Sequence, residues 1–571
     1  MKKCRLFSIL AIFIIGILTF TSCSSKATAT GEVSILDQTR YTLTIKATLN
    51  DDKKEVTAGS VQIQVYKDGD RKTTSNCDKL GGSNEDKSQQ VTIQSLEENT
   101  TYTVKLVCTI NDKQYTLAEE EAKTNKAGSS QEVAIHIKTA DDFSKISNDL
   151  SGYYILDNDI ALGTGKAENE GITEIEKMDL KEWTPLFSNS SSKAFTGTFD
   201  GNGHTISNFK QTSSTSDYGF FGYLSEGATV KNINFDNVYI SMNRYSDTYV
   251  GVVAGRAALG TSISNVNVTN LKMKVTTSST SGKAFYVGGL IGQNTGGNIT
   301  NSTVKDLDLT VENGKIIYVG GIAGENSMAE GKWIEDCTVT GKITVNQVNI
   351  NVSSDLSKSI EVVQLVGGAV GKNDGRVRNT ISYVNIESKF NMDKDFAEKI
   401  YANKDSDDKS EDAEKEWKIN NQINVAIGSF AGYNHGIIRN AAAAGSINFQ
   451  TYNAYNVALG LFCGFNVSDI KPSINHIAYL NNNSTISVKL KEVDGTTSPT
   501  VLKYDRVFNI TVTGKEEENQ AYYEMPTTYE RDECVEAFGT NTEISDFTVT
   551  GRDTFDAEAY AKLIEELKKL F

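Results

Sequence analysis

The first pattern in the chain is alternation of apolar and polar residues. Between Gly31 and Thr124, segments such as YTLTIKATL and TTYTVKLVCTI alternate in this way and are separated by Gly, Asn and Asp turns. A period of two is typical of half-buried strands, and several such strands in a short span indicate a β-sandwich. We therefore expect a small sandwich over residues 33–126, followed by the Gly/Ser-containing joint NKAGSSQ.

Beyond residue 133 a second pattern recurs. An aliphatic residue, a glycine, three mostly small or apolar residues and a second glycine form six hexapeptide segments: VGVVAG at 250–255, VGGLIG at 287–292, VGGIAG at 319–324, VGGAVG at 366–371, IGSFAG at 427–432 and LGLFCG at 459–464. Five of them continue with any residue and then asparagine: Asn294, Asn326, Asn373, Asn434 and Asn466. The first glycines lie 37, 32, 47, 61 and 32 residues apart, and such periods indicate a stacked repeat architecture.

The residue types of the repeats favour strands. The segments are β-branched and Gly-rich, and the whole chain has only four prolines. A unit of this size cannot bury its apolar face alone, whereas stacked coils share one core. The expected fold is therefore all-β: a small β-sandwich, then a right-handed parallel β-solenoid (β-helix) over residues 133–484 with short capping helices.

Glycines at fixed places are expected to supply positive φ at the corners of the coils. The predicted structural glycines are Gly251, Gly255, Gly288, Gly292, Gly320, Gly324, Gly367, Gly371, Gly428, Gly432, Gly460 and Gly464. The recurrent asparagines are expected to stack into amide ladders at those corners.

The stretch FTGTFDGNGHTISNF at 195–209 has the composition of a catalytic cluster, but a structural interpretation fits it better. Asp200, Gly201, Asn202 and Gly203 are turn formers between two strands, and they are predicted to form the turn that starts the solenoid. His204 begins the second strand, with no ligand or base placed beside it in the sequence.

Two helices and one insertion complete the expected solenoid. Asp141–Leu150 has apolar residues at helical spacing and predicts a helix over the first coil, because an open end exposes unpaired backbone. Residues 485–571 are expected to hold the last coils and a capping helix at 554–571; a partner-docking helix is the alternative. The charge-rich insertion at 388–418 predicts a solvated helical excursion, with a recognition loop or cation site as the alternative.

Two resemblances follow from these motifs. LEENTTYTVKL resembles the corner before the penultimate strand of fibronectin type III domains. The resemblance implies a fibronectin/Ig-like sandwich that serves as a spacer. It also implies that the hydroxyl of Tyr102 bonds back to the backbone. VGGLIGQNTGGNITNSTV and its partners resemble the GLUG motifs of bacterial surface proteins and of immunoglobulin-A-cleaving peptidases. With the segments that precede the repeats, the resemblance covers about residues 133–480.

The N-terminus predicts export. Lys2, Lys3 and Arg5 precede an apolar run from Leu6 to Phe20, a pattern typical of a signal peptide over residues 1–22. Cys23 resembles the acylated cysteine of a lipobox, which implies lipidation there, a tether over 23–32 and a protein at the cell surface or outer membrane. An ordinary cleaved signal is the alternative.

Charge and reactive residues narrow the function further. Removing residues 1–22 takes away three positive charges, so the net charge moves from −16 to −19, which argues against nucleic acid as a partner. The cysteines are too scattered for a disulfide framework; Cys77 and Cys108 could pair, but buried free thiols are favoured. His136, His204, His435 and His476 lack metal-ligand spacing, so we expect no metal, cofactor or catalytic residue.

These observations predict a non-catalytic, lipid-anchored surface protein. Its expected role is adhesion, with a glycan or a host or matrix protein as the ligand of the solenoid's lateral face. Two alternatives remain: a polysaccharide lyase or hydrolase, which would show paired carboxylates flanked by aromatic side chains, and a structural component of the envelope.

Overall fold

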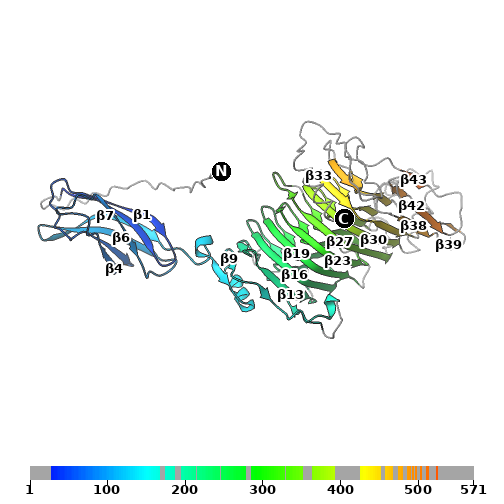
Figure 1. Ribbon diagram of the computed structural model, residues 1–571, viewed down its shortest axis with the longest axis horizontal. Helices are drawn as coiled ribbons and strands as arrows, with labels where there is room; N and C mark the ends of the chain where they lie inside the picture. Colours follow the sequence, from blue (N-terminus) through cyan, green and yellow to red (C-terminus); the bar gives the residue numbers. More distant parts are fainter. Residues whose placement is uncertain are drawn as a thin grey trace, which may run out of the picture. The chain divides into compact units, whose positions relative to one another are not determined.

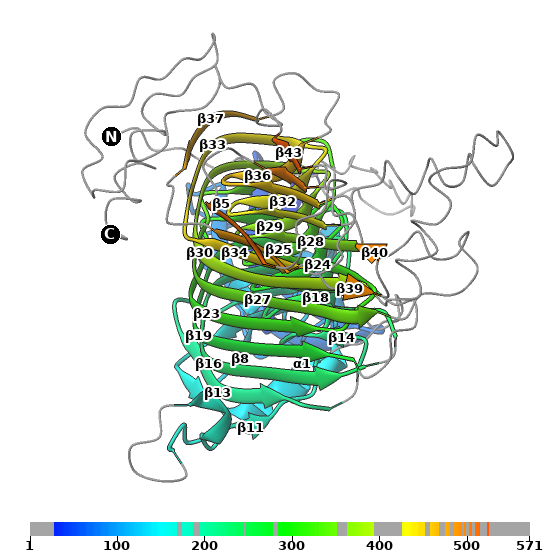
Figure 2. The ribbon, with the colours of Figure 1, turned by 90° about the vertical axis from the view of Figure 1, so that its right-hand side faces the viewer.

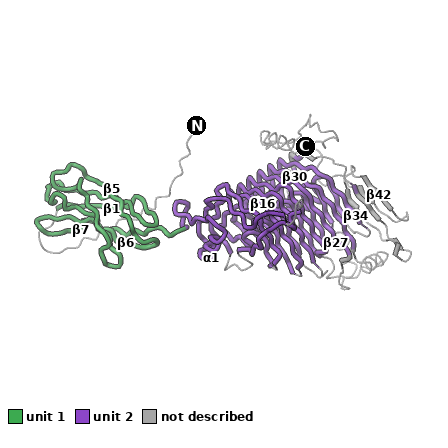
Figure 3. Tube along the Cα trace, turned by 60° about the horizontal axis from the view of Figure 1, so that its bottom comes forward, with its two compact units in different colours: residues 1–127 green, residues 128–571 purple. Residues whose placement is uncertain are grey.

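The computed structural model describes residues 28–479 with gaps at 168–173, 187–193, 214, 245, 278–283, 328, 351–362, 393–424, 452–456 and 467–473. Beyond Tyr479 it describes only short strands up to Glu524. The predicted signal peptide, Cys23 and the helix at 554–571 lie outside the described residues. The chain divides after Ala127 into two compact units, which Figure 3 colours separately.

The first unit consists of two antiparallel sheets around one apolar core. One sheet has the order β1 (Thr30–Gln38), β2 (Leu43–Asn50), β5 (Ser88–Ile93); the other has the order β4 (Asp70–Asn76), β3 (Gln62–Lys67), β6 (Thr101–Ile110), β7 (Lys113–Lys123). In β2 the predicted alternation places Leu43, Ile45 and Ala47 in the core. This unit is the sandwich that the alternation predicts.

The corner before β6 has the predicted hydrogen bond. The buried hydroxyl of Tyr102 accepts a hydrogen bond from the backbone N–H of Glu97 at 2.8 Å. Because the hydroxyl would otherwise be a buried unpaired group, this bond fixes the chain where it enters the strand.

The cysteines of this unit are buried free thiols. Cys77 and Cys108 are both fully buried and unpaired, so the alternative of a disulfide between them is wrong. Burial raises the pKa of each thiol to about 11, because an apolar environment disfavours the thiolate. Both therefore pack as small apolar residues.

The second unit is a parallel β-solenoid whose coils contribute strands to three sheets (Figures 1 and 2). A full coil contains β19 (Ser262–Thr276), then β20 (Ala284–Gly288), then β21 (Ile291–Asn294). Each strand pairs in parallel with its equivalent one coil later, as Tyr286 does with Tyr318. The backbone hydrogen bonds of one coil are thus made by the next, as the repeat predicts.

Within the described residues the long sheet has 18 strands, two of which are β8 and β9 at the start of the unit. Its bounds are β8 (Ile135–Ile137), β9 (Tyr153–Leu156), β10 (Ile160–Ala161), β11 (Lys181–Glu182), β12 (Thr198–Asp200), β13 (Thr205–Gln211), β16 (Thr229–Asn243), β19, β22 (Asn298–Thr300), β23 (Thr303–Glu312), β26 (Ile334–Glu335), β27 (Thr338–Ile350), β30 (Arg376–Met392), β33 (Ile437–Ala444), β34 (Ile447–Thr451), β37 (Ile474–Tyr479), β38 (Thr485–Lys489) and β42 (Asn509–Thr513).

In the part of the chain that the structure describes, the two smaller sheets have nine and seven strands. The nine-stranded sheet holds β14 (Asp217–Tyr218), β17 (Thr248–Val250), β20, β24 (Ile316–Gly320), β28 (Val363–Gly367), β31 (Val425–Gly428), β35 (Val457–Gly460), β41 (Leu502–Tyr504) and β43 (Tyr522–Glu524). The seven-stranded sheet holds β15 (Tyr223–Leu224), β18 (Ala254–Ala257), β21, β25 (Ala323–Asn326), β29 (Val370–Asn373), β32 (Ala431–Asn434) and β36 (Cys463–Asn466).

The predicted helix at Asp141–Leu150 is present as one turn of 3₁₀-helix, η2 (Ala140–Phe143), followed by α1 (Ser144–Asn148). Phe143 is buried and its ring lies 5.4 Å from Trp183 and 5.2 Å from Phe220, between ring centroids. The helix therefore contributes to the aromatic core of the first coils.

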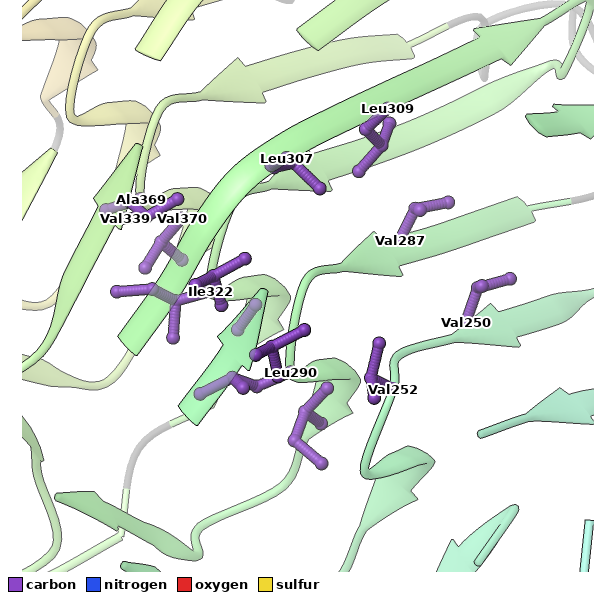
Figure 4. Packing of buried hydrophobic residues seen from close by; sticks show 14 of the residues in the cluster. Val250, Val252, Val287, Leu290, Leu307, Leu309, Ile322, Val339, Ala369 and Val370 are labelled. Carbon is purple, nitrogen blue, oxygen red and sulfur yellow. The ribbon is translucent and has the colours of Figure 1, made fainter. Parts of the chain in front are cut away.

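One apolar core runs through all the described coils. The first residue of each hexapeptide segment, such as Val250 and Val287, is fully buried, and so are Leu290 and Ile322 in the bends that follow (Figure 4). Stacking places equivalent buried residues above one another, so the core continues from coil to coil.

The structure changes one predicted boundary. Ser388 and Phe390 are buried in β30, so the strand continues to Met392 where an insertion was expected from 388; the rest of that insertion lies outside the described residues. Beyond residue 484, β38 and β42 extend the long sheet and β41 and β43 extend the nine-stranded sheet, so the coils continue after the repeat pattern ends.

Candidate functional site

The repeat glycines lie where the nine-stranded sheet turns into the seven-stranded sheet. The expectation that they supply positive φ is wrong, since neither Gly288 nor Gly320 has a φ in the left-handed region. A Cβ on Gly288 would collide with the carbonyl oxygen of Ile291 and lie 2.7 Å from the Cα of Ala323 on the next coil. Glycine is required here because neighbouring backbones pack too closely for any side chain.

The left-handed corners are made by asparagine and aspartate on the long sheet. Their φ values lie between 48° and 54° in one column of equivalent positions: Asn232, Asn265, Asn301, Asp336, Asn379 and Asn440. These residues tolerate that conformation because their short polar side chains bond locally. A short polar residue at the same place in every coil is the signal that could have located these corners in the sequence.

A second asparagine column is buried and forms the predicted amide ladder. The side-chain Nδ2 of Asn294 donates to Oδ1 of Asn326 at 2.9 Å, and Asn326 donates to Asn373 at 2.8 Å. The ladder continues through Asn434 to Asn466, with 2.7 Å at each step. Each internal amide both donates and accepts, so the buried polar groups satisfy one another across the coils.

The turn at Asp200–Gly203 is a corner between β12 and β13, which both pair with β16. Asn202 and Gly203 have φ of 53° and 85°, and His204 N–H donates to Gly201 O at 2.8 Å. The turn is not the first corner, because β9 and β10 already stack beneath β12 and β13. It therefore shapes a later corner of the stack.

Asp200 is buried, and its carboxylate accepts several of the hydrogen bonds that hold that turn. Its carboxylate accepts hydrogen bonds from Asn202 N–H at 2.9 Å, Asn232 Nδ2 at 3.0 Å and the Tyr153 hydroxyl at 3.0 Å, and Lys231 Nζ lies 3.2 Å away. Burial opposes its ionisation, but these donors outweigh burial and hold the pKa of Asp200 below its usual value.

We expect Asp200→Asn to destabilise the solenoid by about 1–3 kcal/mol at pH 7, since an amide cannot accept all of these hydrogen bonds. A carboxyl whose pKa is lowered on folding stabilises above its unfolded pKa, and this stabilisation is lost as the pH falls through the folded pKa. The difference between wild type and variant should therefore shrink below about pH 4. Urea unfolding followed by tryptophan fluorescence measures it; a pH-independent difference would contradict the assignment.

Asp308→Asn is the matched control. Asp308 is exposed and lies 3.6 Å from Lys272 Nζ, and surface pairs of this kind contribute about 0–1 kcal/mol. We expect its substitution to leave the unfolding midpoint in urea nearly unchanged, both at pH 7 and below about pH 4.

Residues that flank the hexapeptide segments form a stripe of half-buried and buried side chains where the two smaller sheets meet. In each coil the residue before the segment belongs to the nine-stranded sheet and the residue after it to the seven-stranded sheet. We call these twelve residues the corner stripe: Tyr249 with Arg256, Tyr286 with Gln293, Tyr318 with Glu325, Leu365 with Lys372, Ala426 with Tyr433 and Ala458 with Phe465.

The side chains of the corner stripe meet across the two sheets. The guanidinium of Arg256 lies 4.5 Å from the ring centroid of Tyr249, and Lys372 Nζ lies 5.7 Å from that of Tyr318. In the later coils Leu365, Ala426 and Ala458 form a buried apolar cluster against partly buried aromatic rings. The stripe thus changes from tyrosines and ions to an apolar cluster along the solenoid.

Each charge in the stripe is paired. Arg256 Nε lies 2.5 Å from Oδ1 of the buried Asp217, and its Nη2 lies 3.1 Å from Oδ2. Lys372 Nζ lies 2.9 Å from Glu325 and 2.7 Å from Asp374. Burial opposes the charge of Lys372, but the two carboxylates outweigh burial and raise its pKa.

The tyrosines of the stripe are held in fixed positions. The rings of Tyr249 and Tyr286 stack with centroids 4.8 Å apart, and Tyr318 meets Tyr286 edge-on at 5.2 Å. Burial raises the pKa of all three hydroxyls, which therefore remain protonated at neutral pH. Chemically, the stripe offers fixed hydroxyl and amide groups of the kind that hydrogen-bond to a ligand.

Two carboxylates beside the stripe are paired with a lysine, and three histidines each lie near one aspartate. The ammonium group of Lys372 forms ion pairs with both Glu325 and Asp374, the carboxylates beside the tyrosines. No group of three or more His, Cys, Asp and Glu that could hold a metal ion occurs among the described residues. The histidines are dispersed: His136 lies 2.6 Å from Asp157, His204 3.2 Å from Asp159 and His435 3.6 Å from Asp374.

Comparison with known proteins identifies the repeat. Residues 283–311 match the GLUG motif. This span includes β20, β21 and most of β23, so the GLUG motif of this chain corresponds to one coil with the close glycine corner and the first amide of the ladder. The five other hexapeptide segments occupy equivalent positions in neighbouring coils.

One curated relative is similar over a short stretch. Halomucin of Haloquadratum walsbyi is 39% identical over 80 residues, which is 14% of this chain and 1% of halomucin. The chain therefore matches only a very small part of that protein. No solved structure matches the chain. Among the helices that the structure describes, none has the length and apolar character needed to span a membrane.

Proposed function

We propose that the protein is a non-catalytic surface lipoprotein whose solenoid serves adhesion. The observation that carries the proposal is the corner stripe: its first three coils place Tyr249, Tyr286 and Tyr318 in a row beside Arg256, Gln293 and Glu325. A repeated row of fixed polar and aromatic groups suits an extended ligand, such as a glycan or a segment of a matrix protein.

The placement at the surface rests on the N-terminal sequence and on the GLUG resemblance. The signal-like residues 1–22 and Cys23 favour export and acylation, and the acidic mature chain suits a water-facing protein without nucleic-acid partners. The sandwich of residues 33–126, in this proposal a fibronectin type III-like domain, spaces a right-handed solenoid from the anchor.

The lipid anchor is tested by metabolic labelling with a palmitate analogue. Wild type should incorporate the label and partition with membranes, whereas Cys23→Ala should lose the label. Cys4→Ala, in the segment expected to be removed, is the control and should label like wild type. Equal labelling of wild type and Cys23→Ala would refute the anchor and leave the binding role to be judged separately.

Adhesion is tested with the soluble fragment 31–571 on an array of glycans and matrix proteins. We expect binding that Tyr286→Ala with Gln293→Ala weakens at least tenfold. Tyr239→Ala, a partly exposed tyrosine of β16 on the long sheet, is the matched control and should bind like wild type. No bound ligand on the array, or equal binding by the stripe variant, would contradict the proposed role of the stripe.

A further inference from the structure

A second cluster of side chains lies on the long sheet, away from the corner stripe. Three successive rungs place Trp333 and Glu335 beside Arg376 and Arg378, and these beside Arg439. We call these five residues the arginine patch. It carries three positive charges and one negative charge on a chain whose net charge is −16, so it departs from the acidic character of the protein.

The patch brings like charges together. Arg378 and Arg439 are direct partners in the parallel pairing of β30 with β33, so their Cα atoms are about 4.8 Å apart. Like charges at directly opposite positions destabilise a sheet. One counter-charge is present, because Arg378 Nη2 lies 2.7 Å from Oε1 of Glu335. Packing alone does not account for a second arginine here.

One N–H of each guanidinium also lacks an acceptor. The Nε atoms of Arg376, Arg378 and Arg439 are buried without a hydrogen-bond partner. Among the described residues, Arg376 and Arg439 make no ion pair, and the guanidinium of Arg376 lies 5.7 Å from the ring centroid of Trp333. Each guanidinium has five N–H donors, and leaving such donors unpaired costs stability.

A bound anion would supply the missing hydrogen-bond acceptors and would also offset the repulsion between the arginines. A planar carboxylate or a sulfate accepts two parallel hydrogen bonds from a guanidinium, and its charge would offset the repulsion between the neighbouring arginines. The half-buried Trp333, with Arg378 4.6 Å from its ring centroid, adds an aromatic ring of the kind that contacts sugars as well as cations. The patch therefore fits an anionic group attached to a sugar.

The position of the arginine patch in the middle of the sheet favours a polysaccharide over an extended peptide as the ligand. The strands of the patch, β26, β30 and β33, each pair on both sides within the long sheet, so no free sheet edge is available there for an extended peptide to join. A polysaccharide needs no backbone pairing and can lie across successive rungs. We infer that the arginine patch binds an acidic polysaccharide, through carboxylate or sulfate groups held by Arg376, Arg378 and Arg439.

The test is binding of the soluble protein to polygalacturonate, measured by calorimetry at low salt. We expect saturable binding that weakens as NaCl is raised, because screening reduces the attraction between partly exposed charges. Arg439→Gln should weaken it at least tenfold, and Arg376→Gln with Arg439→Gln should abolish it. Arg439→Lys, which keeps the charge but loses the planar fork, should recover only part of the affinity.

The controls distinguish binding at the arginine patch from general attraction of a polyanion to basic side chains. Lys342→Gln removes an exposed charge of the same sheet, which lies 3.2 Å from Glu387, and should bind like wild type. Dextran sulfate distinguishes sulfate from uronate, and neutral dextran should not bind. Equal binding by the arginine variants, or equal binding to polyglutamate, would overturn the inference. Thermal melting confirms that the variants fold, and failure of the corner-stripe variants would leave this result unaffected.

Discussion

Gly367→Ala is expected to destabilise the solenoid by about 3–5 kcal/mol. Gly367 ends β28, and a Cβ there would collide with the carbonyl oxygen of Val370. The same Cβ would lie 2.7 Å from Gly432 N and 2.8 Å from the Cα of Ala431 on the next coil. All three atoms are backbone, so two coils would have to separate for the methyl group to fit.

The measurement is urea unfolding followed by tryptophan fluorescence. All three tryptophans, Trp183, Trp333 and Trp417, come after residue 127, so the signal reports the second unit alone. Gly203→Ala is the control, because φ there is +85° but no atom lies within 4 Å of an added Cβ. Its cost should be about 1–2 kcal/mol, that of the left-handed conformation. Equal effects at Gly203 and Gly367 would contradict the steric explanation.

Asn373→Ala is expected to destabilise the same unit by about 2–4 kcal/mol. Asn373 is fully buried, accepts from Asn326 at 2.8 Å and donates to Asn434 at 2.7 Å. Alanine would leave the Nδ2 of Asn326 and the Oδ1 of Asn434 without their partner in the ladder, and each buried unpaired group costs about 1–3 kcal/mol. The unfolding midpoint in urea should fall with little change in slope.

An exposed rung of similar chemistry provides the control. Asn265 donates to Asn232 Oδ1 at 3.0 Å on the surface of the long sheet, with φ of 53°. Asn265→Gly keeps the left-handed conformation, and water can then bond to the Oδ1 of Asn232 in place of the lost amide. We therefore expect the free energy of unfolding to change by less than about 0.5 kcal/mol. If both variants lost the same stability, burial would not be the source of the ladder's strength.

The buried ladder and the apolar core could be predicted because both follow from repetition. Once Asn326 and Asn373 occupy equivalent places in successive coils, parallel stacking brings their amides together whatever the other details are. The role of the glycines could not be predicted in this way. Glycine serves both positive φ and close backbone approach, and the sequence does not distinguish the two.

The corner stripe and the arginine patch were missed for a related reason. Tyr249 and Arg256 stand seven residues apart, and only the angle between two sheets brings their side chains into contact. Arg378 and Arg439 are 61 residues apart, and only the register of β30 with β33 makes them neighbours. The 61-residue interval is visible in the repeat, but the register needed the structure.

The sequence by itself determined that the chain is nearly all β, that its repeats stack in parallel around one core and that asparagines link the coils. These features depend on periodicity, because equivalent residues of stacked coils must meet. Only the tertiary structure decided which side chains face each other between sheets, where left-handed corners fall and which charges lack partners. Those outcomes depend on sheet angle, register and backbone distance, which combine contributions from several coils at once.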